Sequence, residues 1–168
     1  MTDSYFTIGR KTLSEIKISK SKFIGQAIPF VSQSEIPEII KSVKKEYYDA
    51  AHHPYAFRAG VSQNNFRMSD DGEPSGSAGK PILDAIGKFD LTDVIVIIAR
   101  YFGGVKLGVG GLRRAFFETA DHCLHEAVKI EKLITEIVNL EFDYKYMNVV
   151  MNFIETEKIK LLQNSSDE

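Results

Sequence analysis

The run Val94–Ala99 consists of six apolar residues, most of them β-branched. Such a run is too short for an independent helix and is typical of a strand buried on both faces. Five glycines follow within residues 103–111, and apolar side chains then recur at helical spacing from Leu112 to about Lys129. The pattern therefore predicts a buried strand, a glycine-rich loop and a long helix, in that order.

The residues before this run predict a mixture of strands and helices. Residues 1–31 predict two strands, at 12–19 and 22–31, joined by a turn at Lys20-Ser-Lys-Phe. Ser34 is the expected N-cap of a helix that continues to about Tyr47. Further along, the pattern predicts a strand at 55–61, a partner strand from Asn64, a loop at 69–81 and a helix at 82–89.

The pattern changes after residue 130. It predicts a strand at 134–142, a helix at 144–155 and the start of another strand at Lys160. Three such elements cannot bury a core alone. We therefore expect a domain at 1–130 and a segment at 131–168 that docks on it, pairs with another chain, or is a shortened second domain.

Composition narrows the class of protein. A net charge of −2 argues against a globally basic nucleic-acid binder, but residues 80–114 carry six basic side chains against three acidic ones. An anionic partner is therefore expected at the glycine loop. Cys123 falls in the apolar stripe of a predicted helix, and the chain has neither a signal-peptide pattern nor an apolar run of about 20 residues. We expect a cytoplasmic protein without membrane contact, either a monomer or a weak dimer.

Arg113 and Arg114 are predicted in the first turn of the long helix, where the helix dipole disfavours cations by up to about 1 kcal/mol each. They therefore need an anion, and Lys106 in the loop adds to the same field. Two interpretations stay open. The arginines are either solvated side chains on the helix flank or part of a functional surface that faces an anion.

His52, His53 and the segment Asp70-Asp71-Gly72-Glu73 suggest a metal site at first sight. Adjacent histidines in an extended segment project to opposite sides, however, and no His or Cys pair supports the site, so we predict no metal and no cofactor. The three acids could instead pair with Arg58, Arg100 or Arg113–Arg114. Ser75, Ser77 and Gly79 could alternatively contact a phosphate.

Nucleophilic catalysis would need Ser75 or Ser77 with His52 or His53 as the base, and the spacing does not match a nucleophile elbow. The segment Gly108-Val-Gly-Gly-Leu-Arg matches neither the dinucleotide-binding fingerprint nor the P-loop. We therefore predict no catalytic residue. The alternative is a hydrolase or phosphate-ligand enzyme that uses His52, His53 and the Asp70–Glu73 loop.

Three long motifs resemble the IMPACT/YigZ family. They are Ala51-His-His-Pro-Tyr-Ala-Phe-Arg, the segment 69–81 and the segment 100–116, and Lys20-Ser-Lys-Phe-Ile also fits. The resemblance covers about residues 5–130. It implies an α+β fold whose first domain is similar to the second domain of ribosomal protein S5. It also implies a ferredoxin-like second domain, of which residues 131–168 hold only a part.

The resemblance also implies a function. Eukaryotic relatives regulate translation, and some bacterial members carry a prolyl dipeptidase label. Our leading hypothesis is a non-enzymatic protein that binds RNA or a ribosome-associated protein. The expected anion-binding or nucleic-acid-binding residues are Arg58, Arg100, Tyr101, Gly103, Gly104, Lys106, Gly108, Gly110, Gly111, Arg113 and Arg114. The loop residues that carry the family motif are His52, His53, Asp70, Asp71, Gly72, Glu73, Gly76 and Gly79.

Overall fold

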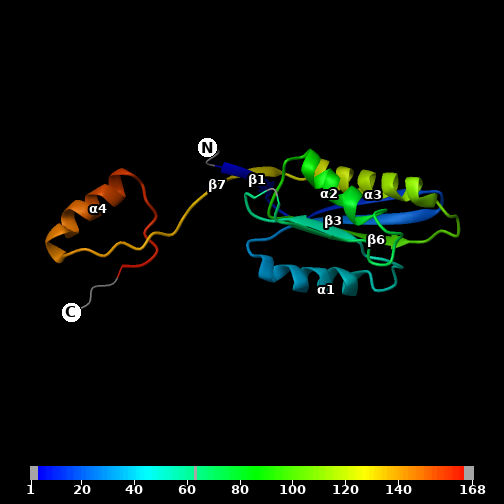
Figure 1. The fold of residues 1–168 in the computed structure, drawn as a ribbon, viewed down its shortest axis with the longest axis horizontal. Helices are drawn as coiled ribbons and strands as arrows, with labels where there is room; N and C mark the ends of the chain where they lie inside the picture. The colour runs from blue at the N-terminus through cyan, green and yellow to red at the C-terminus, as the bar shows by residue number, and fades with distance from the viewer. Residues whose placement is uncertain (1–3, 63, 165–168) are drawn as a thin grey trace. The chain divides into compact units, whose positions relative to one another are not determined.

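The computed structural model describes residues 4–62 and 64–164, and the chain divides into two compact units, Met1–Ile134 and Thr135–Glu168. The first unit is α+β, with a five-stranded antiparallel sheet in the order β2-β3-β6-β4-β5. Helix α1 covers one face of the sheet, and helices α2 and α3 cover the other (Figure 1).

The bounds of the strands and helices follow the chain in order. The strands are β1 Ser4–Ile8, β2 Thr12–Ile18, β3 Ser21–Pro29, β4 Tyr55–Arg58, β5 Phe66–Ser69, β6 Val94–Tyr101 and β7 Lys129–Leu133. The α-helices are α1 Ile36–Glu46, α2 Gly79–Lys88, α3 Gly108–His125 and α4 Met147–Thr156. Two 3₁₀ turns, Gln33–Glu35 and Tyr144–Tyr146, precede α1 and α4.

Strand β6 is the centre of the sheet, as its apolar run predicts. It pairs antiparallel with β3 on one side and with β4 on the other, and every residue from Val94 to Arg100 is buried. A T-shaped contact between Phe23 and Phe116, 5.2 Å between ring centroids, joins the sheet to α3. On the opposite face of the sheet, Ile36 and Val43 of α1 belong to a second cluster of buried hydrophobic side chains.

All three helices of the first unit begin at positions that differ from the predicted ones. Helix α1 begins at Ile36, and Ser32 rather than Ser34 caps the 3₁₀ turn that precedes it, because Glu35 accepts a hydrogen bond from the Ser32 N–H at 2.8 Å and completes a capping box. Helix α2 begins at Gly79 instead of residue 82, and α3 at Gly108 instead of Leu112. Glycine weakens a helix by about 1 kcal/mol, so its low propensity conceals these first turns in the sequence.

A second, two-stranded sheet was missed because its strands are far apart in the chain. Residues 1–31 contain three strands instead of the predicted two, and the additional strand β1 pairs antiparallel with β7, with Ser4 opposite Leu133. The Thr92 N–H donates to the Phe6 carbonyl at 2.9 Å, and Ile8 is buried, so β1 is part of the core.

The second unit contains α4, which confirms the predicted helix at 144–155. The predicted strand at 134–142 and the strand from Lys160 do not form within the described residues 135–164. A strand needs a neighbour for its N–H and C=O groups, and these residues offer none.

Candidate anion-binding surface

Three stretches that are far apart in the sequence meet at the carboxyl end of β6. The Arg100 N–H donates to the His52 carbonyl at 3.0 Å, which brings residues 51–53 to the strand. The Arg100 guanidinium reaches Glu73 in the loop at 70–79. Arg113 of α3 donates from Nη1 to the Gly76 carbonyl oxygen at 3.3 Å. The family-motif loop, the end of β6 and helix α3 therefore form one site.

Asp70 binds the amino end of α2. Its carboxylate accepts N–H bonds from Gly76 at 2.8 Å, from Ala78 at 3.0 Å and from Gly79 at 2.8 Å. Burial raises the pKa of Asp70, but the bonds from Gly76, Gly79 and Ala78 outweigh it, and the pKa lies below its ordinary value. Asp70 is thus a charged cap rather than a proton donor near neutral pH.

Asp71 fastens the same loop to the end of α1. Its carboxylate accepts from the His53 N–H at 2.7 Å and pairs with Lys44 at 2.8 Å. Burial raises the pKa of Asp71, but Lys44 and His53 lower it below the ordinary value. The His53 ring is buried, with Nε2 2.9 Å from the Tyr47 carbonyl oxygen, and His52 Nδ1 lies 2.8 Å from the Asp71 carbonyl oxygen. The two imidazoles therefore serve separate structural bonds.

Glu73 and Arg100 form a buried ion pair. Arg100 Nη1 lies 2.7 and 2.6 Å from the two Glu73 carboxylate oxygens, and the two side chains are 8% and 1% exposed. The guanidinium also lies 5.6 Å from the Phe23 and Phe102 ring centroids. Of the pairings that the sequence left open, this is the one that forms. Arg100 is therefore held by the protein itself and does not face outward.

The glycine-rich loop packs on the turn between β2 and β3. A Cβ atom on Gly103 would lie only 2.0 Å from the Lys20 carbonyl oxygen, so no larger residue fits there. Gly104 and Gly108 have positive φ, at +84° and +68°. Nothing lies within 4 Å of the position that a Cβ atom would take on Gly104, Gly108 or Gly110. Packing therefore explains Gly103, and the backbone above Gly110 is open.

Arg113 and Arg114 are exposed, but they do not occupy the first turn of α3. The helix begins at Gly108, so they are its sixth and seventh residues. The expected conflict with the helix dipole is corrected accordingly, because that effect fades beyond the first turn. The first turn itself consists of Gly108 to Gly111, and within the described chain no side chain caps it.

The tertiary structure adds two cations that were not among the expected anion-binding residues, although both lie in the family segment Lys20-Ser-Lys-Phe-Ile. Lys20 is exposed on the β2–β3 turn beside Gly103, and the Lys22 ammonium lies 4.4 Å from the centroid of the Tyr101 ring. Tyr101 donates to Asp49 at 2.8 Å, and burial together with this bond raises the pKa of Tyr101 to about 12. We define the cationic surface as Lys20, Lys22, Lys106, Arg113 and Arg114.

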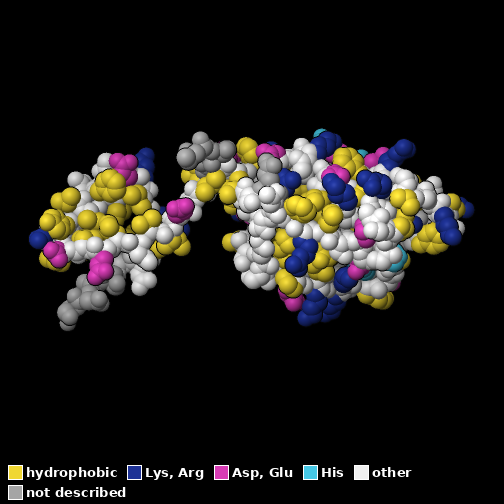
Figure 2. Space-filling model, in the orientation of Figure 1, with side chains coloured by type: hydrophobic (Ala, Val, Ile, Leu, Met, Phe, Trp, Pro, Cys, Tyr) yellow, Lys and Arg dark blue, Asp and Glu magenta, His cyan; other side chains and the backbone are white. Residues whose placement is uncertain are grey.

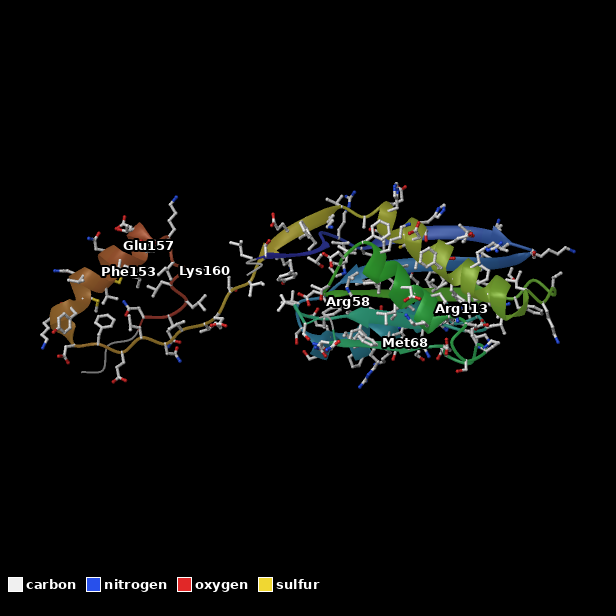
Figure 3. The ribbon with its side chains drawn as sticks, turned by 45° about the horizontal axis from the view of Figure 1, so that its top comes forward. Arg58, Met68, Arg113, Phe153, Glu157 and Lys160 are labelled. Atoms are coloured by element: carbon white, nitrogen blue, oxygen red, sulfur yellow. The ribbon has the colours of Figure 1, made fainter. Side chains whose placement is uncertain are left out.

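Arg58 lies outside this surface. It pairs with Val94 at the opposite end of β6 from Arg100, six residues away along a strand that rises about 3.3 Å per residue. Figure 3 shows Arg58 and Arg113 well apart on the first unit. In Figure 2, Lys and Arg side chains gather with hydrophobic ones at the end of the first unit that carries the β6–α3 loop.

The fold and the surface define a class: an α+β protein with a glycine-rich loop and exposed cations at one end of its central strand. The Impact N-terminal domain model matches residues 19–124, and the chain belongs to the IMPACT family. Among the residues that the structure describes, no helix is long and apolar enough to cross a membrane, and no three His, Cys, Asp or Glu side chains are grouped to hold a metal ion.

Two relatives and one solved structure are similar over most of the chain. IMPACT family member YvyE of Bacillus subtilis (strain 168) is 36% identical over 152 residues, which cover 90% of this chain and 70% of the relative. An IMPACT family member of Haemophilus influenzae is 31% identical over 153 residues, 88% of this chain and 73% of the relative. A crystal structure described as a hypothetical protein has a TM-score of 0.79 at 26% identity and covers 99% of this chain and 82% of that chain.

Proposed function

We propose that the protein binds RNA, free or within the ribosome, through the cationic surface, and that this binding contributes to the regulation of translation in the cytoplasm. The observation that carries the proposal is the unpaired state of the surface. Within the described residues, none of its five cations lies within 4 Å of a carboxylate oxygen.

Four of the five lysines of α1 and α2 behave differently, the exception being Lys45. Lys41 pairs with Glu38, Lys44 with Asp71 and Lys80 with Asp84. These pairs leave little charge for a partner, whereas an unpaired group of cations attracts the phosphates of a nucleic acid. The contrast supports an external anion at the cationic surface.

The amino-terminal ends of α2 and α3, which both lie in the site, also differ from each other. Asp70 occupies the end of α2, but the first turn of α3 has no capping side chain among the described residues. Its N–H groups point toward the loop, and the open space above Gly110 lets a phosphate approach the backbone.

Apolar side chains accompany the cations. Phe102 is 52% exposed and Val105 is 44% exposed, and both lie in the loop between β6 and α3. Exposed aromatic rings beside cations stack on unpaired bases, which is the usual mode of single-stranded RNA recognition. This combination supports RNA over a small inorganic anion.

The enzyme alternative draws less support from the contacts. Asp70, Asp71 and Glu73 are bound to backbone N–H groups, Lys44 and Arg100, and the lowered pKa values of Asp70 and Asp71 do not suit general acids. His52 and His53 contact carbonyl oxygens. The loop at 70–79 thus has a structural role, which is to hold the residues of the cationic surface in position.

The proposal is tested with the variant Arg113→Ala/Arg114→Ala and a fluorescent single-stranded RNA. We expect weaker binding and a plot of log affinity against log salt that is shallower by about 1.4 to 1.8, because each phosphate contact contributes about 0.7 to 0.9. Anisotropy titrations over a range of salt concentrations measure both quantities.

The matched control is Lys41→Ala/Lys45→Ala, which removes two exposed charges from α1 on the other face of the sheet. It should retain the wild-type affinity and salt dependence. Equal RNA binding by the arginine variant and the wild type, with both folded by circular dichroism, would show that the surface is not the RNA site.

A further inference from the structure

Strand β5 is an open edge of the main sheet. The sheet order ends at β5, whose only strand partner in the described chain is β4. Phe66, Arg67 and Met68 are exposed, and Figure 3 marks Met68 on this strand. An edge strand offers unpaired N–H and C=O groups to another chain.

The register identifies the groups that face outward. The Ala59 N–H donates to the Asn65 carbonyl at 2.9 Å, so Asn65 is directed toward β4. Hydrogen-bonded and non-bonded pairs alternate in an antiparallel ladder, and Arg67 opposite Phe57 therefore also faces β4. The backbone N–H and C=O groups of Phe66 and Met68 point away from the sheet.

A groove lies beside this edge on the α1 side. Its volume is about 390 Å³, and its walls come from α1, β4 and β5. Ile36, Ile40 and Phe57 supply its apolar part, and Arg67 lies at its border. The groove is large enough for one or two side chains of an added strand, which alternate between the two faces of a sheet.

The two faces of β5 differ in character. Arg67 is exposed on the α1 face, and no carboxylate in the described chain lies within 4 Å of it. Phe66 and Met68 are 45% and 43% exposed on the opposite face. An added strand would therefore lie beside the Arg67 cation on one face of the sheet and beside the apolar side chains of Phe66 and Met68 on the other.

We propose that β5 binds an extended segment of a partner protein as a sixth strand of the sheet. The segment places a carboxylate side chain opposite Arg67 and apolar side chains opposite Phe66 and Met68. A second copy of this chain fits less well, because β5 carries no carboxylate to place opposite Arg67. This site is separate from the cationic surface and does not depend on RNA binding.

The probe is the synthetic peptide Ser-Thr-Val-Glu-Val-Thr-Ser, whose palindromic sequence fits β5 in either direction. Amide hydrogen exchange of the full chain is followed by NMR with and without the peptide. At a peptide concentration that fills about nine-tenths of the sites, the Phe66 and Met68 amides should exchange about tenfold more slowly. The Arg67 amide, which already bonds to β4, is the internal control.

Reversing the charge on the peptide and on Arg67 tests whether their ion pair determines which peptide binds. The peptide with Lys in place of Glu should bind the wild type about fivefold more weakly, and Arg67→Glu should reverse this preference. Met68→Pro removes one outward N–H without removing a bond to β4, and it should abolish binding of both peptides.

Unchanged exchange at Phe66 and Met68, or a preference that Arg67→Glu does not reverse, would overturn the proposal. Sedimentation that shows a dimer of the free protein, lost in Met68→Pro, would assign the edge to a second copy and overturn it as well. Slower exchange of the same two amides with an RNA oligonucleotide, and not with the peptide, would assign the edge to RNA and also refute it.

Discussion

Single residues hold the family-motif loop in place, and the Glu73–Arg100 pair is the most buried of these contacts. The Arg100 and Glu73 side chains are only 8% and 1% exposed, so both charges are almost entirely removed from water. Removing two charges from water costs several kcal/mol per ion, and only close pairing offsets that cost. The sequence offered four arginines as partners for the acidic loop, and the distance between Arg100 and Glu73 selects one.

Replacing Glu73 alone should therefore be costly. Glu73→Leu leaves the Arg100 charge buried without a partner, and we expect the free energy of unfolding to fall by about 3 to 5 kcal/mol. The double variant Glu73→Leu/Arg100→Met should recover most of the loss, because an apolar pair of similar volume carries no charge to desolvate. Urea unfolding of both variants measures the difference, and equal losses in the two would contradict this account.

At the scale of elements, loops control where the helices begin. Helix α2 starts at Gly79 because Asp70, nine residues earlier, accepts its first N–H groups. Sequence rules look for a cap immediately before the helix, so they placed this start at Ile82. Helix α3 starts among glycines for a comparable reason: its position on the sheet, set by Leu112, Ala115 and Phe116, outweighs weak local propensity.

The charge on Asp70 makes α2 sensitive to acid. The folded state lowers the pKa of Asp70 below 3.8, so its stabilisation is complete above that value and is lost as pH falls through the lower folded pKa. Asp70→Ala should lower stability near pH 7 by about 0.5 to 2 kcal/mol. Its free energy of unfolding should also fall less steeply than that of the wild type below about pH 4. Chemical denaturation at several pH values tests this, and parallel curves would refute it.

At the scale of the whole molecule, a strand from the beginning of the first unit pairs with a strand from its end. Strand β1 pairs with β7, and the second unit begins only after Ile134. All buried hydrophobic residues of the described chain lie between Ile8 and Leu124. We therefore expect the stability of the first unit to depend on β7 and not on the residues that follow it.

Two truncations distinguish these contributions. A chain that ends at Ile134 should keep the free energy of unfolding of the full chain to within about 0.5 kcal/mol, because it loses no core residue. A chain that ends at Val128 loses β7, leaves the β1 ladder unpaired, and should be less stable by about 2 kcal/mol or more. Urea unfolding compares the three chains, and equal stability of the two truncations would show that β7 is dispensable.

Features that depend only on neighbours in the chain could be predicted from the amino-acid sequence. The apolar run at Val94–Ala99 was enough to identify the central strand, and helical spacing identified the helices, because burial and periodicity are local properties. The three motifs identified the family and the loops of the site. Local pattern did not reveal β1, which needs a partner more than 120 residues away.

Which charged side chains are free to meet a partner depends on the folded structure and could not be predicted from the sequence. Asp70, Asp71, Glu73 and Arg100 were all candidates for the site, and their internal bonds remove them from contact with a partner. Lys20 and Lys22 entered the cationic surface because the β2–β3 turn packs against Gly103. Pairing between charges depends on distances between residues that are far apart in the sequence, and those distances are known only once the chain is folded.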